Sequence, residues 1–471
     1  YYVPNAYQGL VGRLTYEYAS RYLAEFNMGY NGTENFAKGK RFGFFPAVSL
    51  GWVISEEKFF PKNNIVKYLK VRGSYGEVGN DQIGGDRFLY LPSSYGAASD
   101  SGVNKYNFGL ASNPYTSLMI VENKIGNPDL TWEKAKKMNV GVDINLFNNC
   151  LTASFDIFKE KRNNILANRS TSPMIIGANL PAYNFGEMEN RGWEMDLNFR
   201  HHIQDFHYWA RFNYSFARNE IIYMDEVQKR YDYQMTTGRR KNQFFGLIFD
   251  GYYNSWEEIN ALDRPKSSWS GNQLQPGDVK YIDVNQDGVI DDYDMVPIGY
   301  TPVPEIIYGF SFGAQYKGFD FSILFQGADN VSIKYFGRSM WPFAKGEESA
   351  KSLIKERWTQ ERYEAGEKIT FPRLSLNPNG ETDHNYRPST LWIRDASYLR
   401  LKNLEVGYTF TGGFVKRLNL NSVRLYFNGS NLFTWTDVVD LDPEAPSRSG
   451  NVEINTYPLQ KVYNIGLNIN F

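Results

Sequence analysis

"WEMDLNFR", residues 193–200, alternates apolar and polar side chains at every position. Trp193, Met195, Leu197 and Phe199 fall on one side of an extended chain, and charged or amide residues separate them. Successive side chains of a β-strand point to opposite faces of a sheet. The period of two therefore predicts a strand with one apolar face.

The same alternation recurs in "YWARFNYSF" (208–216), "IYGFSFGAQY" (307–316) and "KVYNIGLNINF" (461–471). The apolar faces are rich in Phe, Tyr and Trp, whereas the core of a soluble sandwich favours Val, Ile and Leu. Aromatic residues near strand ends are typical of membrane barrels. The last segment alternates up to a C-terminal Phe471, which resembles the terminal strand signal of outer-membrane barrels.

Composition limits the class of protein. The 471 residues carry a net charge of −1, so the total shows no basic footprint for nucleic acid. There is one cysteine, Cys150, which excludes an internal disulfide. The mean hydropathy is −0.50, and the sequence contains no apolar run long enough for a membrane helix. These values fit a soluble all-β protein or a transmembrane β-barrel.

The connections between the expected strands decide between these two classes. Short connections fall at 18–21, 148–150, 201–206, 317–318 and 411–421, and one of intermediate length falls at 56–64. Long connections fall at 32–41, 80–129, 161–185, 222–304, 328–396 and 436–460. Short periplasmic turns that alternate with long extracellular loops are a property of outer-membrane barrels. We therefore predict an all-β, transmembrane antiparallel β-barrel.

The strand signals give a count of about thirteen. Single-chain bacterial barrels have even strand numbers, and an odd count from a periplasmic C-terminus places Tyr1 on the extracellular side. We therefore expect residues 1–471 to form the C-terminal portion of a barrel, with an N-terminal part absent from this chain.

A calcium motif lies inside the long loop 222–304, at residues 283–294. Asp283, Asn285, Asp287, Asp291 and Asp294 supply side-chain oxygens at positions 1, 3, 5, 9 and 12 of an EF-hand or dockerin-like loop. Gly288 takes the sharp turn at position 6, and Val289 offers its main-chain carbonyl at position 7. Ca²⁺ prefers six to eight such hard oxygens, so we predict a calcium site. A solvated Asp/Asn/Gly turn is the alternative.

The segments around this motif argue against a calcium sensor. Pro276, Pro297, Pro302 and Pro304 interrupt both flanks, whereas a sensor needs two helices that the ion can move. We expect instead a structural Ca²⁺ that rigidifies an extracellular loop with no core of its own.

Several long stretches resemble SusC-like TonB-dependent outer-membrane transporters. They include "GRLTYEYASRYLAEFNMGYNG", "RFGFFPAVSLGWVISEEKFF", "LKVRGSYGEVGND", "NPDLTWEKAKKMNVGVDINLF" and "GDVKYIDVNQDGVIDDYDMVPIG", together with the terminal strand. They run in family order from near residue 10 to residue 471. The resemblance implies that this chain is the C-terminal thirteen strands or so of a 22-stranded barrel, with the plug and the N-terminal strands absent from this chain.

The resemblance also implies a function and partners. Members of this family import oligosaccharides or oligopeptides across the Gram-negative outer membrane. A SusD-like surface lipoprotein covers the barrel as a lid, and the TonB complex supplies energy through the N-terminal part. A dimer of transporter–lid pairs and contact with membrane lipid are further expectations.

Ligand contacts are expected from loop aromatics. Trp256, Trp269, Trp341 and Trp358 lie in long loops, where they can stack on a ligand, pack the loops or contact a lid. Inward polar residues such as Glu194, Asp196, Arg211 and Arg424 are expected to form lumen salt bridges.

The other motifs do not predict an enzyme active site. "GFSFG" (309–313) matches a nucleophile elbow, but Ser311 falls within an alternating strand rather than at a strand-to-helix turn. His201, His202 and His207 have no acidic or cysteine partner at zinc spacing, so we interpret them as polar turn residues.

Two other functions remain open from the sequence. One is a passive porin or scaffold barrel, against which the very long loops argue. The other is a soluble calcium-binding surface β-protein, such as an adhesin or a glycan-binding module.

Overall fold

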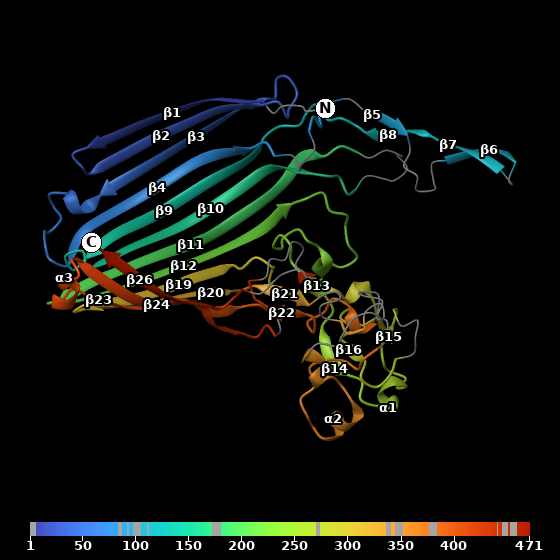
Figure 1. Ribbon diagram of the computed structural model, residues 1–471. Helices are drawn as coiled ribbons and strands as arrows, with labels where there is room; N and C mark the ends of the chain where they lie inside the picture. Colours follow the sequence, from blue (N-terminus) through green and yellow to red (C-terminus); the bar gives the residue numbers. More distant parts are fainter. Residues whose placement is uncertain are drawn as a thin grey trace.

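The structure is a computed structural model (Figure 1). It describes residues 6–82, 87–91, 94–97, 105–110, 113–171, 180–269, 274–335, 341–343, 352–375, 384–439, 441–444, 451–452 and 459–471.

Thirteen strands form one antiparallel sheet, which confirms the expected count. In spatial order they are β1 (Tyr7–Tyr18), β2 (Tyr22–Thr33), β3 (Phe42–Val53), β4 (Val66–Asn80), β9 (Glu133–Leu146), β10 (Leu151–Ala167), β11 (Tyr183–Ile203), β12 (Phe206–Tyr223), β19 (Ile306–Tyr316), β20 (Phe319–Asp329), β23 (Tyr398–Phe410), β24 (Ser422–Thr436) and β26 (Val462–Asn470). The sheet curves into an open wall whose two edges are β1 and β26 (Figure 1).

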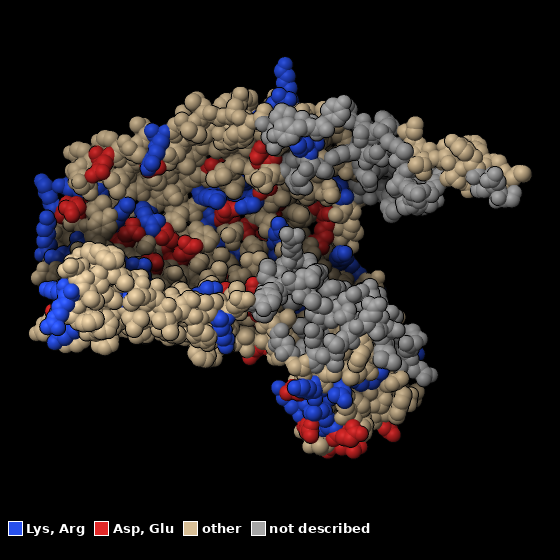
Figure 2. Space-filling model, viewed as in Figure 1, with Lys and Arg blue, Asp and Glu red and all other residues tan. Residues whose placement is uncertain are grey.

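The register places the apolar positions of neighbouring strands side by side. Leu197 pairs with Phe212, and Phe212 pairs with Phe310 on the next strand. Large apolar side chains on this face are exposed, among them Phe155, Ile157 and Phe310. The opposite face lines the hollow of the curved sheet, where Lys, Arg, Asp and Glu gather (Figure 2). The predicted division into an apolar outer face and a polar inner face is therefore confirmed.

Short turns join the strands at one end of the sheet (Figure 1). The two residues between β19 and β20, Lys317 and Gly318, both have positive φ, as a tight hairpin requires. The turn between β23 and β24 contains the short helix α3 (Gly413–Arg417). Every connection that the sequence marks as short lies at this end.

The long connections project from the other end and carry small elements of their own. Two hairpins pair β5 (Ser94–Ala97) with β8 (Ile120–Lys124) and β6 (Lys105–Leu110) with β7 (Asn113–Leu118). The remaining elements are β13 (Phe245–Gly246), β14 (Phe249–Tyr252), α1 (Trp256–Ile259), β15 (Lys266–Ser267), β16 (Val279–Tyr281), β17 (Val289–Ile290), β18 (Val296–Pro297), β21 (Ser332–Tyr335), α2 (Gln360–Glu364), β22 (Ile393–Asp395) and β25 (Asn451–Val452). We call this second group, from residues 224–305, 330–397 and 437–460, the loop layer.

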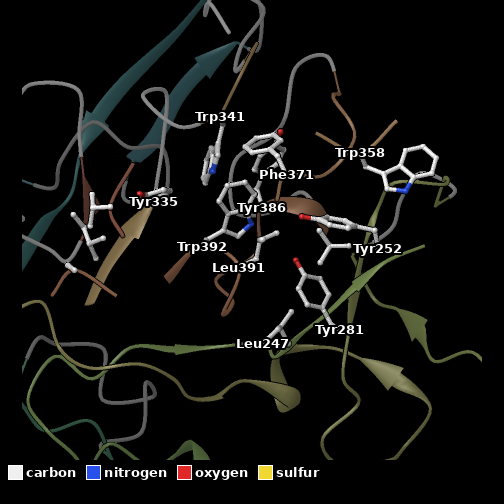
Figure 3. Packing of buried hydrophobic residues seen from close by; sticks show 14 of the residues in the cluster. Leu247, Tyr252, Tyr281, Tyr335, Trp341, Trp358, Phe371, Tyr386, Leu391 and Trp392 are labelled. Carbon is white, nitrogen blue, oxygen red and sulfur yellow. The ribbon is translucent and has the colours of Figure 1, made fainter. Parts of the chain in front are cut away.

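The largest hydrophobic core lies in the loop layer and not in the sheet. It includes Leu247, Val279 and Tyr281 from the first connection, Trp358 and Trp392 from the second, and further residues from all three (Figure 3). The expectation that the loop 222–304 has no core of its own is therefore wrong. A single strand pattern could not reveal this core, because its members come from three connections far apart in sequence.

Two further expectations concern local structure. Ser311 lies within β19 and pairs with Arg211 and Leu324, so it has no strand-to-helix turn around it. Among the described residues, no helix is both long and apolar enough to cross a membrane.

Candidate functional site: the lumen wall and the loop layer

The predicted calcium loop is a compact turn in which acidic oxygens accept main-chain hydrogen bonds. The carboxylate of Asp283 accepts from the N–H groups of Gln286 and Gly288, at 2.7 and 2.8 Å. Gly288 has φ of +82°, a conformation that favours glycine. Asp287 accepts from the N–H of Val289 at 2.9 Å. The motif is therefore a tight turn in which its own acidic side chains hold the main chain.

Asp294, at the last position of the motif, closes the loop. Its side chain is fully buried and accepts from the N–H groups of Val284, Asn285 and Asp291 at 2.8, 3.3 and 2.9 Å. Burial raises the pKa of this carboxyl, the three N–H groups oppose the rise, and the charge of Asp283 adds to it. A bound cation would offset this desolvation, so the donor set suits Ca²⁺ chemically.

The acidic side chains of the motif accept hydrogen bonds from its own main chain. The carboxylates of Asp283 and Asp294 point at main-chain donors, and the described residues hold no group of three or more His, Cys, Asp or Glu arranged around a metal position. The calcium site of Asp283, Asn285, Asp287, Val289, Asp291 and Asp294 therefore stays a prediction.

The calcium motif is fastened to the rest of the loop layer. Tyr233 donates from its hydroxyl to the carbonyl of Tyr293 at 2.7 Å, and the side chain of Gln234 donates to the carbonyl of Asp292 at 2.8 Å. β17 within the motif pairs with β15, and β18 directly after it pairs with β13. A change in this turn would therefore reach the core of the loop layer.

The four loop tryptophans have different environments. Trp341 and Trp358 are 4% and 8% exposed and belong to the loop-layer core, so their burial favours the packing role (Figure 3). Trp269 packs partly against the same core, and the guanidinium of Arg387 lies 4.0 Å from its ring centre. Trp256 is 51% exposed on α1, so it alone of the four offers a large open surface for a ligand ring.

Ion pairs cross the lumen wall between strands. Arg72 on β4 donates to both oxygens of Asp156 on β10 at 2.6 Å each, and to Asp143 on β9 at 3.0 Å. Arg424 on β24 pairs likewise with Asp320 and Glu405, which supports the expected lumen salt bridges. Of the other inward residues, Glu194 accepts from Ser215, and Asp196 and Arg211 line one shallow hollow of the wall.

A glycine lies at the centre of each of these networks. Gly141 is paired with both Arg72 and Asp156, and a Cβ there would lie 2.5 Å from the Asp156 carboxylate and 2.8 Å from the guanidinium. Gly407 lies between Asp320 and Arg424, and a Cβ there would lie 2.7 Å from a carboxylate oxygen of the first and 2.7 Å from a guanidinium nitrogen of the second. The missing side chain lets the ion pair span an entire strand.

Buried ion pairs also fasten the loop layer to the sheet. Arg400 on β23 is 2% exposed and donates to Asp442 at 2.7 Å and to Glu444, both in the connection after β24. We call Arg400, Asp442 and Glu444 the loop clamp. Burial alone would raise the pKa of Asp442, but the hydrogen bond from Arg400 and two main-chain donors lower it overall.

A second such contact lies at the root of the loop 222–304. Glu305, directly before β19, accepts from Arg218 at 2.9 and 2.8 Å and from Arg240 in the loop. Sequence reasoning identified neither Glu305 nor Arg400. Their partners are far away in sequence, and a lone charge in a strand carries no signal of a buried pair.

A curved antiparallel sheet with an apolar outer face, a charged lumen and loops at one end defines a transmembrane β-barrel. The chain belongs to the family described as "TonB dependent receptor-like, beta-barrel", whose model matches residues 2–432. This family is one of outer-membrane proteins, so the protein is placed in the Gram-negative outer membrane. The resemblance to SusC-like TonB-dependent transporters is confirmed.

Two curated relatives extend the match over nearly the whole chain. "TonB-dependent receptor P3" of Formosa agariphila is 28% identical over 479 residues, which cover 98% of this chain and 45% of the relative. "TonB-dependent receptor SusC" of Bacteroides thetaiotaomicron is 28% identical over 477 residues, which cover 100% and 44%. The chain therefore spans about half the length of the relatives it matches.

Solved structures agree on the fold. The structure titled "Structure of the RagAB peptide transporter" aligns with a TM-score of 0.75 and 23% identity, covering 99% of this chain and 47% of that chain. The "closed-closed" state of the RagAB peptide importer aligns with a TM-score of 0.73, also at 23% identity. At this identity the likeness establishes the fold.

We predict that removal of calcium loosens the motif without unfolding the barrel. Chelator added to the full-length protein should expose the chain near Asp287 to limited proteolysis, and Asp287→Asn should lower calcium affinity about tenfold in calorimetric titration, because it removes one ligand charge. Asp292→Asn is the control, since Asp292 lies at a non-ligand position. Equal cleavage with and without chelator would contradict the site.

We predict that Gly141→Ala destabilises the sheet by about 1–3 kcal/mol, because the added methyl group forces Arg72 and Asp156 apart. Gly73→Ala is the matched control on a neighbouring strand, where the nearest atom to a new Cβ is 3.8 Å away. Urea unfolding of the full-length protein in lipid vesicles measures both. Equal free energies of unfolding for the two variants would contradict the prediction, because they would mean that a methyl group at Gly141 fits beside Arg72 and Asp156 without destabilising the sheet.

We predict that Arg400→Ala releases the segment 441–444. Removal of Arg400 leaves the nearly buried carboxylate of Asp442 without its cation, which costs about 3–5 kcal/mol. Hydrogen exchange should rise at these residues, whereas Lys402→Ala, which removes a half-exposed cation 3.6 Å from Glu444, should have little effect.

The loop clamp also gives a pH dependence. Because the folded-state pKa of Asp442 is lowered, its contribution is present above its unfolded pKa of about 3.9 and is lost as the pH falls through the lower folded value. The protection factors at 441–444, which divide the intrinsic exchange rate at each pH by the observed rate, should therefore stay constant from neutral pH to about pH 5. A fall in these protection factors between pH 7 and pH 5 would argue against this assignment.

Proposed function

We propose that the full-length protein actively imports oligosaccharides or oligopeptides across the outer membrane, with energy supplied through TonB. The observation that carries the proposal is the family match, which runs over residues 2–432 and agrees with the thirteen-stranded sheet. Substrate and partners are proposals because the chain spans about half of its curated relatives.

The lumen wall supports a large polar substrate. Its inner face carries Arg72, Asp143, Asp156 and Arg424 in ion pairs and further charges at Glu194, Asp196 and Arg211, so the wall is hydrophilic. Hydroxyl or amide groups of a substrate could exchange hydrogen bonds with such a wall as they pass. The exposed ring of Trp256 suits stacking on a sugar ring or an aromatic side chain.

The loop layer supports a lid partner. It has its own hydrophobic core, and buried ion pairs at Arg400 and Glu305 hold it on the sheet. A rigid platform of this kind suits a SusD-like lipoprotein that closes over the extracellular end. A dimer of transporter–lid pairs and structural calcium in the loop layer belong to the same proposal.

A passive porin or scaffold barrel is the alternative function. It shares the sheet and the polar inner face, but it needs neither TonB nor a lid. The soluble calcium-binding protein is set aside, because the family is one of outer-membrane barrels.

Uptake in cells that lack the native gene tests the proposal. Cells complemented with the full-length protein should accumulate labelled oligosaccharides or oligopeptides, and uptake should fall to background in a TonB-deficient strain or after a protonophore is added. The intact protein should be almost silent in planar bilayers. Uptake that persists without TonB, together with large steady conductance, would identify a porin.

A further inference from the structure

The outer face of the sheet changes character part-way along its central strands. Ile157, Trp193 and Phe216 are direct neighbours on β10, β11 and β12. Two residues further toward the long-loop end, the same face carries Lys159, Arg191 and Arg218. The lipid-facing surface therefore changes from apolar to basic over two residues along each of these strands.

These three cations lie in one row across the sheet. Lys159 pairs with Arg191, and Arg191 pairs with Arg218, so like charges stand directly opposite each other twice. We call Lys159, Arg191 and Arg218 the basic row. Like charges in direct cross-strand pairs are destabilising. Residues that destabilise the folded state are often functional, and a bound partner of opposite charge can offset the free energy lost to repulsion between them.

The nearest acidic groups lie on the side away from the apolar band. Lys159 contacts Glu189 at 2.9 Å, and Arg191 approaches Glu220 only to 4.0 Å. Lys159 and Arg191 keep 56% and 61% of their side-chain surface exposed. Arg218 donates to Glu305 and is 40% exposed, so it forms the more fixed end of the row.

An aromatic surface lies directly on the membrane side of the basic row. Trp193 stacks on Tyr214 with ring centres 4.8 Å apart, and Phe155 and Tyr308 extend this surface to the neighbouring strands. Aromatic rings of this kind occupy the interface between hydrocarbon and headgroups. The cations just beyond them therefore lie at the level of the lipid headgroups of the outer leaflet.

The strand lengths agree with this level. A tilted strand crosses a bilayer in about 9–11 residues, whereas β10, β11 and β12 have 17, 21 and 18. These strands are therefore long enough to extend beyond the membrane at the long-loop end. The basic row marks the point where they leave it.

We propose that the basic row binds the phosphate of an outer-leaflet glycolipid, with the acyl chains lying along Phe155, Ile157 and Trp193. A phosphate dianion placed between Lys159 and Arg191 would remove the repulsion within the row, and a guanidinium can bind two of its oxygens at once. The apolar surface below the row provides contact for the chains. The inference rests on the outer-membrane location and is independent of the transported substrate.

Lipid binding to the delipidated full-length protein tests this inference. The probes are lipid A with both phosphates and the same lipid after enzymatic dephosphorylation, titrated and counted by native mass spectrometry. We expect the phosphorylated probe to bind the wild type at least fivefold more tightly than the dephosphorylated one. The double variant Lys159→Gln/Arg191→Gln should lose this preference, whereas Lys159→Arg/Arg191→Lys should keep most of it.

The matched control is Lys161→Gln, which removes a cation of similar exposure from the next row, where Glu187 pairs with it at 2.9 Å. Heat-modified migration on gels confirms that each variant forms the barrel. The inference is overturned if the double Gln variant binds the phosphorylated probe as the wild type does. It is also overturned if the variant loses only self-association, since the row would then serve a protein contact.

Discussion

Hydrocarbon offers no hydrogen-bond partner, so each backbone N–H and C=O of a strand inside a bilayer must bond to a neighbouring strand. The thirteen-stranded sheet follows from this constraint. Each strand pairs with the next along the sheet, and β10 keeps an unbroken register with β11 from Leu151 to Arg162. The constraint also fixes the side chains, because a strand in register has one face for lipid and one for the lumen.

A sheet of this kind has no interior in which to bury apolar side chains. The larger core lies in the loop layer, where water is present and long connections can fold on one another. Charged groups then have two different uses. In the lumen they span strands across a glycine, as Arg72 and Asp156 do, and at the roots of the loops they are buried, as Arg400 and Glu305 are.

The sheet could be predicted from the sequence because its signal is local. The alternation in residues 193–200, the short turns and the strand count each depend on neighbours in the chain, and the structure agrees with all three. The loop-layer core and the loop clamp could not be predicted in this way. Arg400 lies near the start of β23, and its partners Asp442 and Glu444 follow the end of β24. The chain brings them together only after β23 has run to the short-turn end of the sheet and β24 has returned to the long-loop end.

The tryptophans show the same limit. Trp256 and Trp341 look equivalent in the sequence, yet one is 51% exposed and the other 4%. The burial of a tryptophan depends on which distant segments pack over it, and the sequence next to the tryptophan does not predict those segments. The calcium motif is the reverse case: its spacing is clear in the sequence, but the described residues hold no group of three or more acidic side chains around a metal position.

Site-directed spin labelling along β11 tests the central claim most directly. In the full-length protein with Cys150→Ser, and with any cysteine outside these 471 residues likewise replaced, single labels should alternate along residues 193–199. Labels at Met195 and Leu197 should have access to oxygen from the lipid, and labels at Glu194 and Asp196 should have access to a water-soluble nickel chelate. Labels at Glu187 and Glu189, on the lipid-facing side but beyond the basic row, should be accessible to the chelate. A pattern without alternation, or chelate access at Met195 and Leu197, would contradict the account.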